Sequence, residues 1–306
     1  MRELPARALF AAAREGGYAI AAFNVSNLET AQAVLAAAEE SSAPVILQVS
    51  PGAIAYAGYR PLTRLMMDLA GEALVPVVVH LDHCREPAVV ERAIDDGYDS
   101  VMFDGSRLEL EANLRSTVRL VELARRRAGV AVEAELGVIG GSEDTDPSIG
   151  VPTVRPEDAA AFASATGIDV IAPALGNLHR MPDDSTRLDA GLVRAIAEAT
   201  RLPIALHGAS GIARDQLPEL VAAGIGKVNI SSRVSRALAA GIRESWAAED
   251  GGDLRRFLGA GRDRVREMAL EYIRLTGGAR RAALQRAAAV SGPDASPPAA
   301  APWEAE

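Results

Sequence analysis

Three histidines of the sequence are placed where they could bind one metal ion together. His83, His179 and His207 each lie at or just beyond the end of a short apolar run. Imidazole nitrogens are good ligands for zinc, and a catalytic zinc keeps one position open for a substrate. A single histidine near a glycine is more often a hydrogen-bonded structural residue, but three such residues on one rim favour a zinc site. The fourth histidine, His80, falls inside an apolar run, and we expect it to support the site or to lie in the core.

Several carboxylates accompany these histidines. Asp82 directly precedes His83, so it can act as a general acid or base near the metal, or it can orient a histidine. Asp104 and Glu135 end two further apolar runs, and we expect them to support the ligands or to form an alternative metal position. Glu143 lies in a segment rich in glycine and polar residues, which predicts a loop over the site. It is either a group that reaches the substrate when the loop closes or a solvated loop charge.

Two further segments are suited to binding a phosphate group. Residues His207–Gly211 and Asn229–Ser232 follow apolar runs and combine backbone N–H groups with serine hydroxyls. The second segment opens a helical pattern, and the N-terminus of a helix favours an anion. We therefore expect a phosphate at these segments.

The chain has a single lysine, Lys227, at the beginning of an apolar run. An enzyme that activates a carbonyl group as a Schiff base needs a lysine amine beside the carbonyl carbon. We expect Lys227 to lie at the end of the fold away from the polar residues. Carbonyl chemistry in this chain would then need a metal ion to polarise the substrate.

Strands and helices that must position these residues alternate along the chain. Eight strand-like apolar runs, each followed by a helical pattern, predict βα units and a parallel sheet. Ser26 and Glu29 are expected to cap the first helix that follows a strand. The runs are Tyr18–Phe23, Val45–Val49, Val77–Leu81, Ser100–Phe103, Val130–Glu135, Val170–Pro173, Pro203–Leu206 and Lys227–Ile230.

Eight such units can close as a (β/α)8 TIM barrel or lie open as a doubly wound sheet. No G-x-G-x-x-G turn follows an early strand, which favours the barrel. In a barrel the C-terminal strand ends share one mouth, where the chemistry takes place. Because a barrel needs about 250 residues, we expect a single α/β domain over residues 1–287 with a C-terminal helical extension. The Ala- and Pro-rich residues 288–306 are expected to form a disordered tail.

Charge and cysteine content limit the partners and the compartment. The net charge of −9 argues against nucleic acid but does not exclude a small anionic substrate. Cys84 is the only cysteine, so an intrachain disulfide is impossible and a reducing compartment is favoured. The apolar run Ala8–Ala13, between Arg7 and Arg14, is too short for a signal peptide or a membrane span. We expect a soluble, cytoplasmic protein without nucleic-acid or membrane partners.

Eight segments resemble, in order, the class II fructose-bisphosphate aldolase family, including its tagatose-bisphosphate branch. A loose match at Leu275–Ala282 extends the resemblance from about residue 18 to about residue 282. The HLDHC and LHGASGI motifs carry most of the specificity. The segments are Tyr18–Ser26, Gln48–Gly58, His80–Cys84, Ser100–Ser106, Glu133–Asp144, Gly176–His179, Leu206–Ile212 and Lys227–Ile230.

This resemblance implies a zinc-dependent lyase of carbohydrate metabolism, such as glycolysis. It would reversibly cleave a ketose bisphosphate into dihydroxyacetone phosphate and an aldehyde such as glyceraldehyde 3-phosphate. Asp82 matches the acid/base at the hydroxyl group of the new carbon–carbon bond, and Glu143 matches the loop base that deprotonates dihydroxyacetone phosphate. The matched zinc ligands are His83, His179 and His207, with Asp104 and Glu135 at a second, displaced metal position. The matched substrate and phosphate positions are Asn24, Ser50, Gly176, Gly208, Ser210, Asn229, Ser231 and Ser232. A bound Na⁺ or K⁺ and a homodimer or homotetramer are also expected.

Departures from the family pattern leave the substrate open. Arg180 follows His179 where the family usually has glycine, and it could block the phosphate or pair with it. Arg233 stands where the family commonly has an acid. Arg280 and Arg281, in a segment that only loosely matches, could contact phosphate or be solvated.

Three other functions remain as alternatives. The chain could be an aldolase for a different ketose or a ketose monophosphate, or a non-catalytic sugar-phosphate-binding subunit. A zinc hydrolase on the same barrel would usually carry a His-x-His pair in the first strand, and Phe23-Asn24 offers none.

Overall fold

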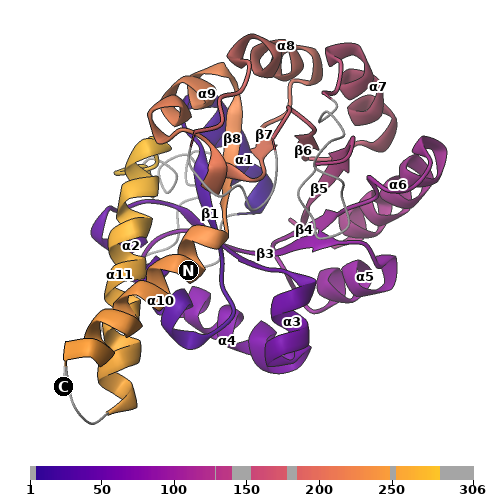
Figure 1. The fold of residues 1–306 in the computed structure, drawn as a ribbon. Coiled ribbons are helices and arrows are strands. Elements are labelled where there is room, and N and C mark those ends of the chain that lie inside the picture. The colour runs from indigo at the N-terminus through magenta and orange to yellow at the C-terminus, as the bar shows by residue number, and fades with distance from the viewer. Residues whose placement is uncertain (1–4, 128, 140–152, 178–184, 249–252, 283–306) are drawn as a thin grey trace, which may run out of the picture.

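Eight parallel strands form a closed barrel in which each strand pairs with the next and the last pairs with the first (Figure 1). The expected (β/α)8 barrel is therefore confirmed. A computed structural model describes residues 5–127, 129–139, 153–177, 185–248 and 253–282, so the expected tail lies outside the described residues. The strands are β1 (Ile20–Asn24), β2 (Val45–Val49), β3 (Val77–Cys84), β4 (Ser100–Phe103), β5 (Ala131–Leu136), β6 (Val170–Pro173), β7 (Ile204–Leu206) and β8 (Ile225–Ile230).

Helices surround the barrel, and α10 and α11 pack against each other on one side of it (Figure 1). The helices are α1 (Ala6–Glu15), α2 (Leu28–Glu40), α3 (Pro51–Ala57), α4 (Tyr59–Glu72), α5 (Pro87–Asp95), α6 (Leu110–Arg126), α7 (Pro156–Thr166), α8 (Ala190–Thr200), α9 (Leu217–Ala223), α10 (Ser232–Ala248) and α11 (Leu254–Leu275), with short 3₁₀ turns at Ala209–Gly211 and Arg214–Gln216. None of the helices in the described ranges is long and apolar enough to cross a membrane.

The cap of α2 differs from the sequence prediction by one residue. Asn27, not Ser26, is the N-cap, and its side-chain oxygen accepts a hydrogen bond from the backbone N–H of Thr30 at 3.1 Å. Asparagine is at least as good a cap as serine, so the helix begins one residue later than expected.

Side chains along each strand alternate between the interior of the barrel and the layer of helices. In β5, Val132 and Ala134 pack outward in the main core, whereas Ala131 belongs to a separate interior cluster. This interior cluster also contains Leu9 and Phe10 of α1, which covers the N-terminal end of the barrel. Because apolar side chains fill that end, the polar inward residues gather towards the other end, where the strands finish.

Candidate metal and substrate site

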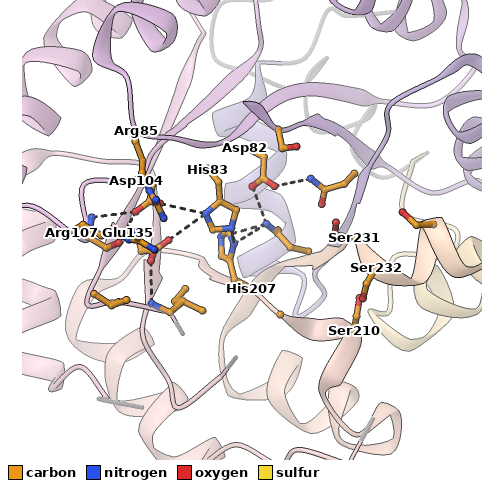
Figure 2. Close-up of a pocket in the computed structure, with 18 of the residues that line it drawn as sticks. Asp82, His83, Arg85, Asp104, Arg107, Glu135, His207, Ser210, Ser231 and Ser232 are labelled. Atoms are coloured by element: carbon orange, nitrogen blue, oxygen red, sulfur yellow. Dashed lines mark hydrogen bonds and ion pairs between the residues drawn. The ribbon is translucent and has the colours of Figure 1, made fainter. Parts of the chain in front are cut away.

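A pocket of about 770 Å³ opens at the C-terminal ends of the strands. Figure 2 shows Asp82, His83 and His207 in its middle, with Asp104 and Glu135 on one side and the serines of the expected phosphate segments on the other. Twelve predicted site residues line this pocket: Asn24, Ser50, Asp82, His83, Asp104, Glu135, His207, Gly208, Ser210, Asn229, Ser231 and Ser232.

Three predicted residues are not placed on the pocket wall. His179 and Glu143, like Arg180, lie outside the described residues, so their roles stay predictions. Gly176 follows β6 with a positive φ of 84°, but it is not one of the described residues that line the pocket. Its neighbour Asn177 donates a hydrogen bond to the backbone oxygen of His207 at 2.8 Å and so ties this turn to the site from behind.

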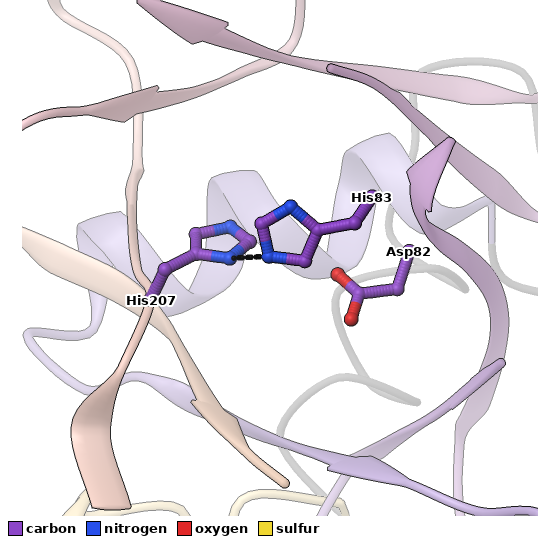
Figure 3. Close-up of side chains that lie close together, drawn as sticks. All are labelled: Asp82, His83 and His207. Carbon is purple, nitrogen blue, oxygen red and sulfur yellow. Dashed lines mark hydrogen bonds between the residues drawn. The ribbon is translucent and has the colours of Figure 1, made fainter. Parts of the chain in front are cut away.

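Two imidazole rings come together at the centre of the pocket. Nε2 of His83 lies 2.7 Å from Nδ1 of His207, and the rings meet edge to face with their centroids 4.4 Å apart (Figure 3). Asp82 completes a group in which one potential ligand atom of each residue lies within 4.8 Å of the others. Two imidazoles and a carboxylate form a donor set that zinc accepts.

His83 reaches the pocket because β3 is irregular at this point. In a regular strand consecutive side chains point to opposite faces, so Asp82 and His83 could not both face inward. The pairing of β3 with β4 shifts register between Leu81 and Cys84, and His83 has a left-handed φ of 49°. A bulge of this kind re-aims a side chain, and both residues line the pocket as a result.

Asp82 is held by amide groups from three strands. Its carboxylate accepts hydrogen bonds from Asn24 at 2.8 Å and from Asn229 at 3.3 Å, with Gln48 at 3.4 Å. Burial opposes its ionisation, but the nearby charges of His83 and Lys227 outweigh burial and lower the pKa of Asp82. The side chain is therefore a fixed, ionised carboxylate that can accept a proton beside the imidazoles.

Asp104 and Glu135 form a second group with the other face of His83. Nδ1 of His83 lies 3.5 Å from Glu135 and 3.9 Å from Asp104, and these three residues also satisfy the spacing of a metal site. Asp104 already accepts hydrogen bonds from Ser106 at 2.6 Å and from Arg85 at 2.8 Å. Burial raises the pKa of Glu135 to about 7, and its Oε2 has no hydrogen-bond partner among the described residues.

The electrostatics of the site fit a metal cation. Burial would lower the pKa of His83, but the surrounding carboxylates of Asp82 and Glu135 raise it overall. Such a raised pKa means that positive charge is favoured at this ring. The buried Oε2 of Glu135 and Oδ1 of Asn229 lack hydrogen-bond partners within the described ranges, which is consistent with a ligand between these groups.

Lys227 lies in the barrel interior below the imidazoles. We expected from the sequence that it lies at the end of the fold away from the polar residues. Its Nζ lies 2.7 Å from Glu133 and 3.2 Å from His80, and all three side chains are fully buried. The prediction was wrong because a lysine side chain spans several ångströms towards the mouth from its place on β8. His80 is a core residue, as expected, and burial holds its pKa well below the ordinary value.

The expected phosphate segments form the other side of the pocket. Gly208 has a left-handed φ of 67°, which turns the chain after His207 into the 3₁₀ turn containing Ser210. Ser231 and Ser232 stand at the start of α10, and the first turn of a helix presents backbone N–H groups that favour an anion. Arg233 donates a hydrogen bond from Nε to the backbone oxygen of Ser210 at 3.3 Å and so joins the two segments.

Arg280 and Arg281 are far from this pocket, so they do not contact a phosphate in it. The backbone N–H of Arg280 bonds to the oxygen of Ser41, which precedes β2 at the N-terminal end of the barrel. Arg281 lies over the ring of Tyr18, just before β1.

Sequence reasoning missed several residues of the site. Arg85, Ser106, Arg107, Ser235 and Arg236 line the pocket, and Glu133 contacts His207 from below at 2.9 Å. A usable signal existed for Glu133, because it precedes Glu135 by two residues on one strand and must share its face. The arginines lie in loops or on a helix, where no periodic pattern marks the side chains that turn towards the mouth.

The fold and the site define a (β/α)8 barrel with residues at its C-terminal mouth whose spacing suits a metal ion. The sequence model described as Fructose-bisphosphate aldolase class-II matches residues 5–281. The chain belongs to this family, whose members are lyases and are generally metal-dependent.

Individual relatives agree with this family. The fructose-bisphosphate aldolase of Geobacillus stearothermophilus is 38% identical over 89% of this chain and 96% of its own length. A probable fructose-bisphosphate aldolase of Bacillus subtilis is 38% identical over 88% of this chain and 96% of its own. Among solved structures, the YdjI aldolase from Escherichia coli K12 superposes with a TM-score of 0.80 and 32% identity, covering 91% of this chain and 99% of that one. The crystal structure of a putative fructose-1,6-biphosphate aldolase from Coccidioides immitis gives a TM-score of 0.82 and 30% identity, covering 93% and 100%.

Proposed function

We propose that this chain is a zinc-dependent aldolase that reversibly cleaves a ketose bisphosphate into dihydroxyacetone phosphate and an aldehyde such as glyceraldehyde 3-phosphate. The observation that carries the proposal is the group of Asp82, His83 and His207 within 4.8 Å of one another, in the same pocket as the serine-rich phosphate segments. Relatives named fructose-bisphosphate aldolase support the reaction class.

His83 and His207 would hold the zinc, with His179 as the third ligand by sequence resemblance. When bound, the metal supplies Lewis-acid polarisation of the ketose carbonyl and offsets the charge that develops on its oxygen. Asp104 and Glu135, together with His83, are the residues that would provide the alternative metal position.

Asp82 acts on the proton of the substrate hydroxyl group. In the cleavage direction its ionised carboxylate accepts the proton from the hydroxyl group next to the bond that breaks, and in condensation it returns that proton. The amides of Asn24 and Asn229 hold the carboxylate in one orientation during both steps. Glu143, on the basis of the sequence match, exchanges the proton at the carbon beside the carbonyl of dihydroxyacetone phosphate.

One phosphate group of the substrate would bind between Gly208, Ser210, Ser231 and Ser232. Backbone N–H groups at the start of α10 and the serine hydroxyls would donate to it. Arg85 and Arg107 line the opposite side of the pocket (Figure 2). Arg236 of α10 lines the pocket beside the serines, so cationic side chains on both sides favour a ketose with two anionic groups over a monophosphate, and an aldolase for a different ketose remains the second candidate. A monovalent cation, a homodimer or homotetramer and a cytoplasmic location complete the proposal.

The test combines metal removal with a substrate panel. A zinc chelator should abolish cleavage of fructose 1,6-bisphosphate or tagatose 1,6-bisphosphate, and added zinc should restore it. The bisphosphates should be cleaved faster than ketose monophosphates and non-phosphorylated ketoses measured beside them. Activity that survives both chelation and His207→Ala would overturn the metal assignment. Binding of the sugar phosphates without cleavage of any of them would favour the non-catalytic alternative.

A further inference from the structure

A continuous buried polar chain ends at the ring of His207, and its other four members have no part in the chemistry proposed above. Ser100, His80, Lys227, Glu133 and His207 are each fully buried in the barrel interior. Consecutive members are 2.9 Å, 3.2 Å, 2.7 Å and 2.9 Å apart, so hydrogen bonds connect them from β4 to the turn after β7.

We propose that Glu133, held in place by Lys227, is a positioning residue that fixes the ring of His207 and presents its Nδ1 to the metal. The proposal rests on the metal-dependent function above and concerns how this chain orients one ligand. A metal-binding histidine commonly donates its other ring N–H to a carboxylate, which fixes the tautomer and the orientation of the ring.

Hydrogen-bond donors and acceptors leave one consistent arrangement. The ammonium group of Lys227 can only donate, so Nε2 of His80 accepts from it, and Nδ1–H of His80 donates to Ser100. Oε2 of Glu133 also accepts from Lys227, and its Oε1 is left to accept from Nε2–H of His207. Nδ1 of His207 then carries a lone pair, which the side-chain N–H of Asn229 also approaches at 3.2 Å.

That lone pair faces the proposed metal. Nδ1 of His207 is the atom that lies 2.7 Å from Nε2 of His83, so the two nitrogens of the imidazole pair converge on one point. Glu135 lies behind the opposite nitrogen of His83 at 3.5 Å, and it comes from the same face of β5 as Glu133. One strand thus places a carboxylate behind each of the two described imidazoles.

Stability alone is a poor reason for this buried ion pair. Removing two charges from water costs about as much as their attraction returns, and apolar pairs of similar size often stabilise a protein as well. The sequence has 32 lysine and arginine residues, and arginine is used at all of them except Lys227. This single lysine is fully buried against Glu133. The position of Glu133 against His207 gives the pair a specific task.

Three variants separate positioning from folding: Glu133→Gln, Lys227→Met and the double variant. Each single variant leaves an uncompensated buried charge, so we expect the melting temperature of the metal-free protein to fall. The double variant removes both charges and should recover most of that loss. Its zinc affinity should nevertheless stay about 10- to 100-fold weaker than that of the unaltered protein, because glutamine does not enforce the tautomer of His207.

Zinc affinity would be measured by chelator competition, and the ligand geometry from the visible absorption spectrum of the Co²⁺-substituted protein. The matched control is Thr63→Val, which removes a buried hydrogen bond to Tyr98 outside the barrel and should lower stability without changing either metal readout. A double variant with unaltered zinc affinity and an unaltered Co²⁺ spectrum would overturn the positioning role while leaving the proposed function standing. Failure of the unaltered protein to bind zinc would overturn the proposed function itself.

Discussion

Replacing Asp82 by asparagine keeps the size of the side chain and removes its ability to take a proton. The structure allows this change because the surrounding amides can adapt. Asn24 can still donate to the new amide oxygen, as it does to Asp82 at 2.8 Å. The Oδ1 of Asn229 has no hydrogen-bond partner among the described residues, so its amide can turn over and accept from the new N–H group.

The expected effect on stability is therefore small and that on catalysis large. Three charge-assisted hydrogen bonds become neutral ones at a loss of about 1 kcal/mol each, but the buried charge of Asp82 also disappears and offsets most of that loss, so the net cost to the free energy of unfolding is about 1 kcal/mol. General acid–base catalysis contributes about 10²- to 10⁴-fold to a rate, so Asp82→Asn should lower kcat for cleavage by that factor. Such a loss corresponds to about 3–5 kcal/mol in the activation free energy.

Three measurements on Asp82→Asn distinguish the possible roles of this carboxylate. A coupled assay follows cleavage of the bisphosphate, isotope exchange into dihydroxyacetone phosphate follows deprotonation at carbon, and zinc content follows metal binding. We expect cleavage to fall while exchange and zinc content persist, because Asp82 acts at the hydroxyl group. A cleavage rate equal to that of the unaltered enzyme would refute the assignment, and loss of zinc together with exchange would make Asp82 a metal ligand.

Three other changes test separate parts of the molecule. Glu143→Ala should abolish isotope exchange at dihydroxyacetone phosphate with zinc still bound, and unchanged exchange would reject the loop base. Gly224→Ala should destabilise the protein by about 1–3 kcal/mol, because Gly224 has a φ of 128° and a Cβ would overlap a side chain of α8. The control is Gly259→Ala within α11, where a Cβ meets nothing within 4 Å, and it should stabilise the protein by about 0.5–1 kcal/mol. Chemical denaturation measures both changes. Arg85→Met uncovers a carboxylate oxygen of Asp104 at the alternative metal position, and we expect titration calorimetry to show tighter Co²⁺ binding; an unchanged affinity would argue against metal binding there.

The strands could be predicted from sequence because helices cover the barrel on its outside and side chains fill it on the inside. Such strands appear as short continuous apolar runs, and the predicted bounds of β2, β4 and β6 are those of the structure. The prediction for β3 ended at Leu81, whereas the strand continues through His83 to Cys84. Polar residues at a strand end have no apolar signature, so the functional part of a strand is the part that periodicity misses.

The rim of the pocket was predictable because parallel strands bring their C-terminal ends to one mouth. Contacts across the interior of the barrel could not be predicted, because they depend on the stagger between strands and not on spacing along the chain. Glu133, Lys227 and His80 meet across the barrel from β5, β8 and β3, and their sequence positions do not show that they touch. Arg280 and Arg281 illustrate the converse, since charge and a loose motif match did not bring them to the pocket.

The kink at His83 fixes a distance that the enzyme would otherwise have to maintain by packing. Asp82 and His83 are covalent neighbours that face one cavity, so the backbone that joins them limits the separation between the proposed proton carrier and the proposed metal ligand. Breathing of the barrel or movement of a loop can change how the substrate sits, but it cannot pull these two functions apart. Asparagine tolerates the left-handed backbone better than most residues. His83→Asn would therefore remove the imidazole while keeping the backbone conformation at this position.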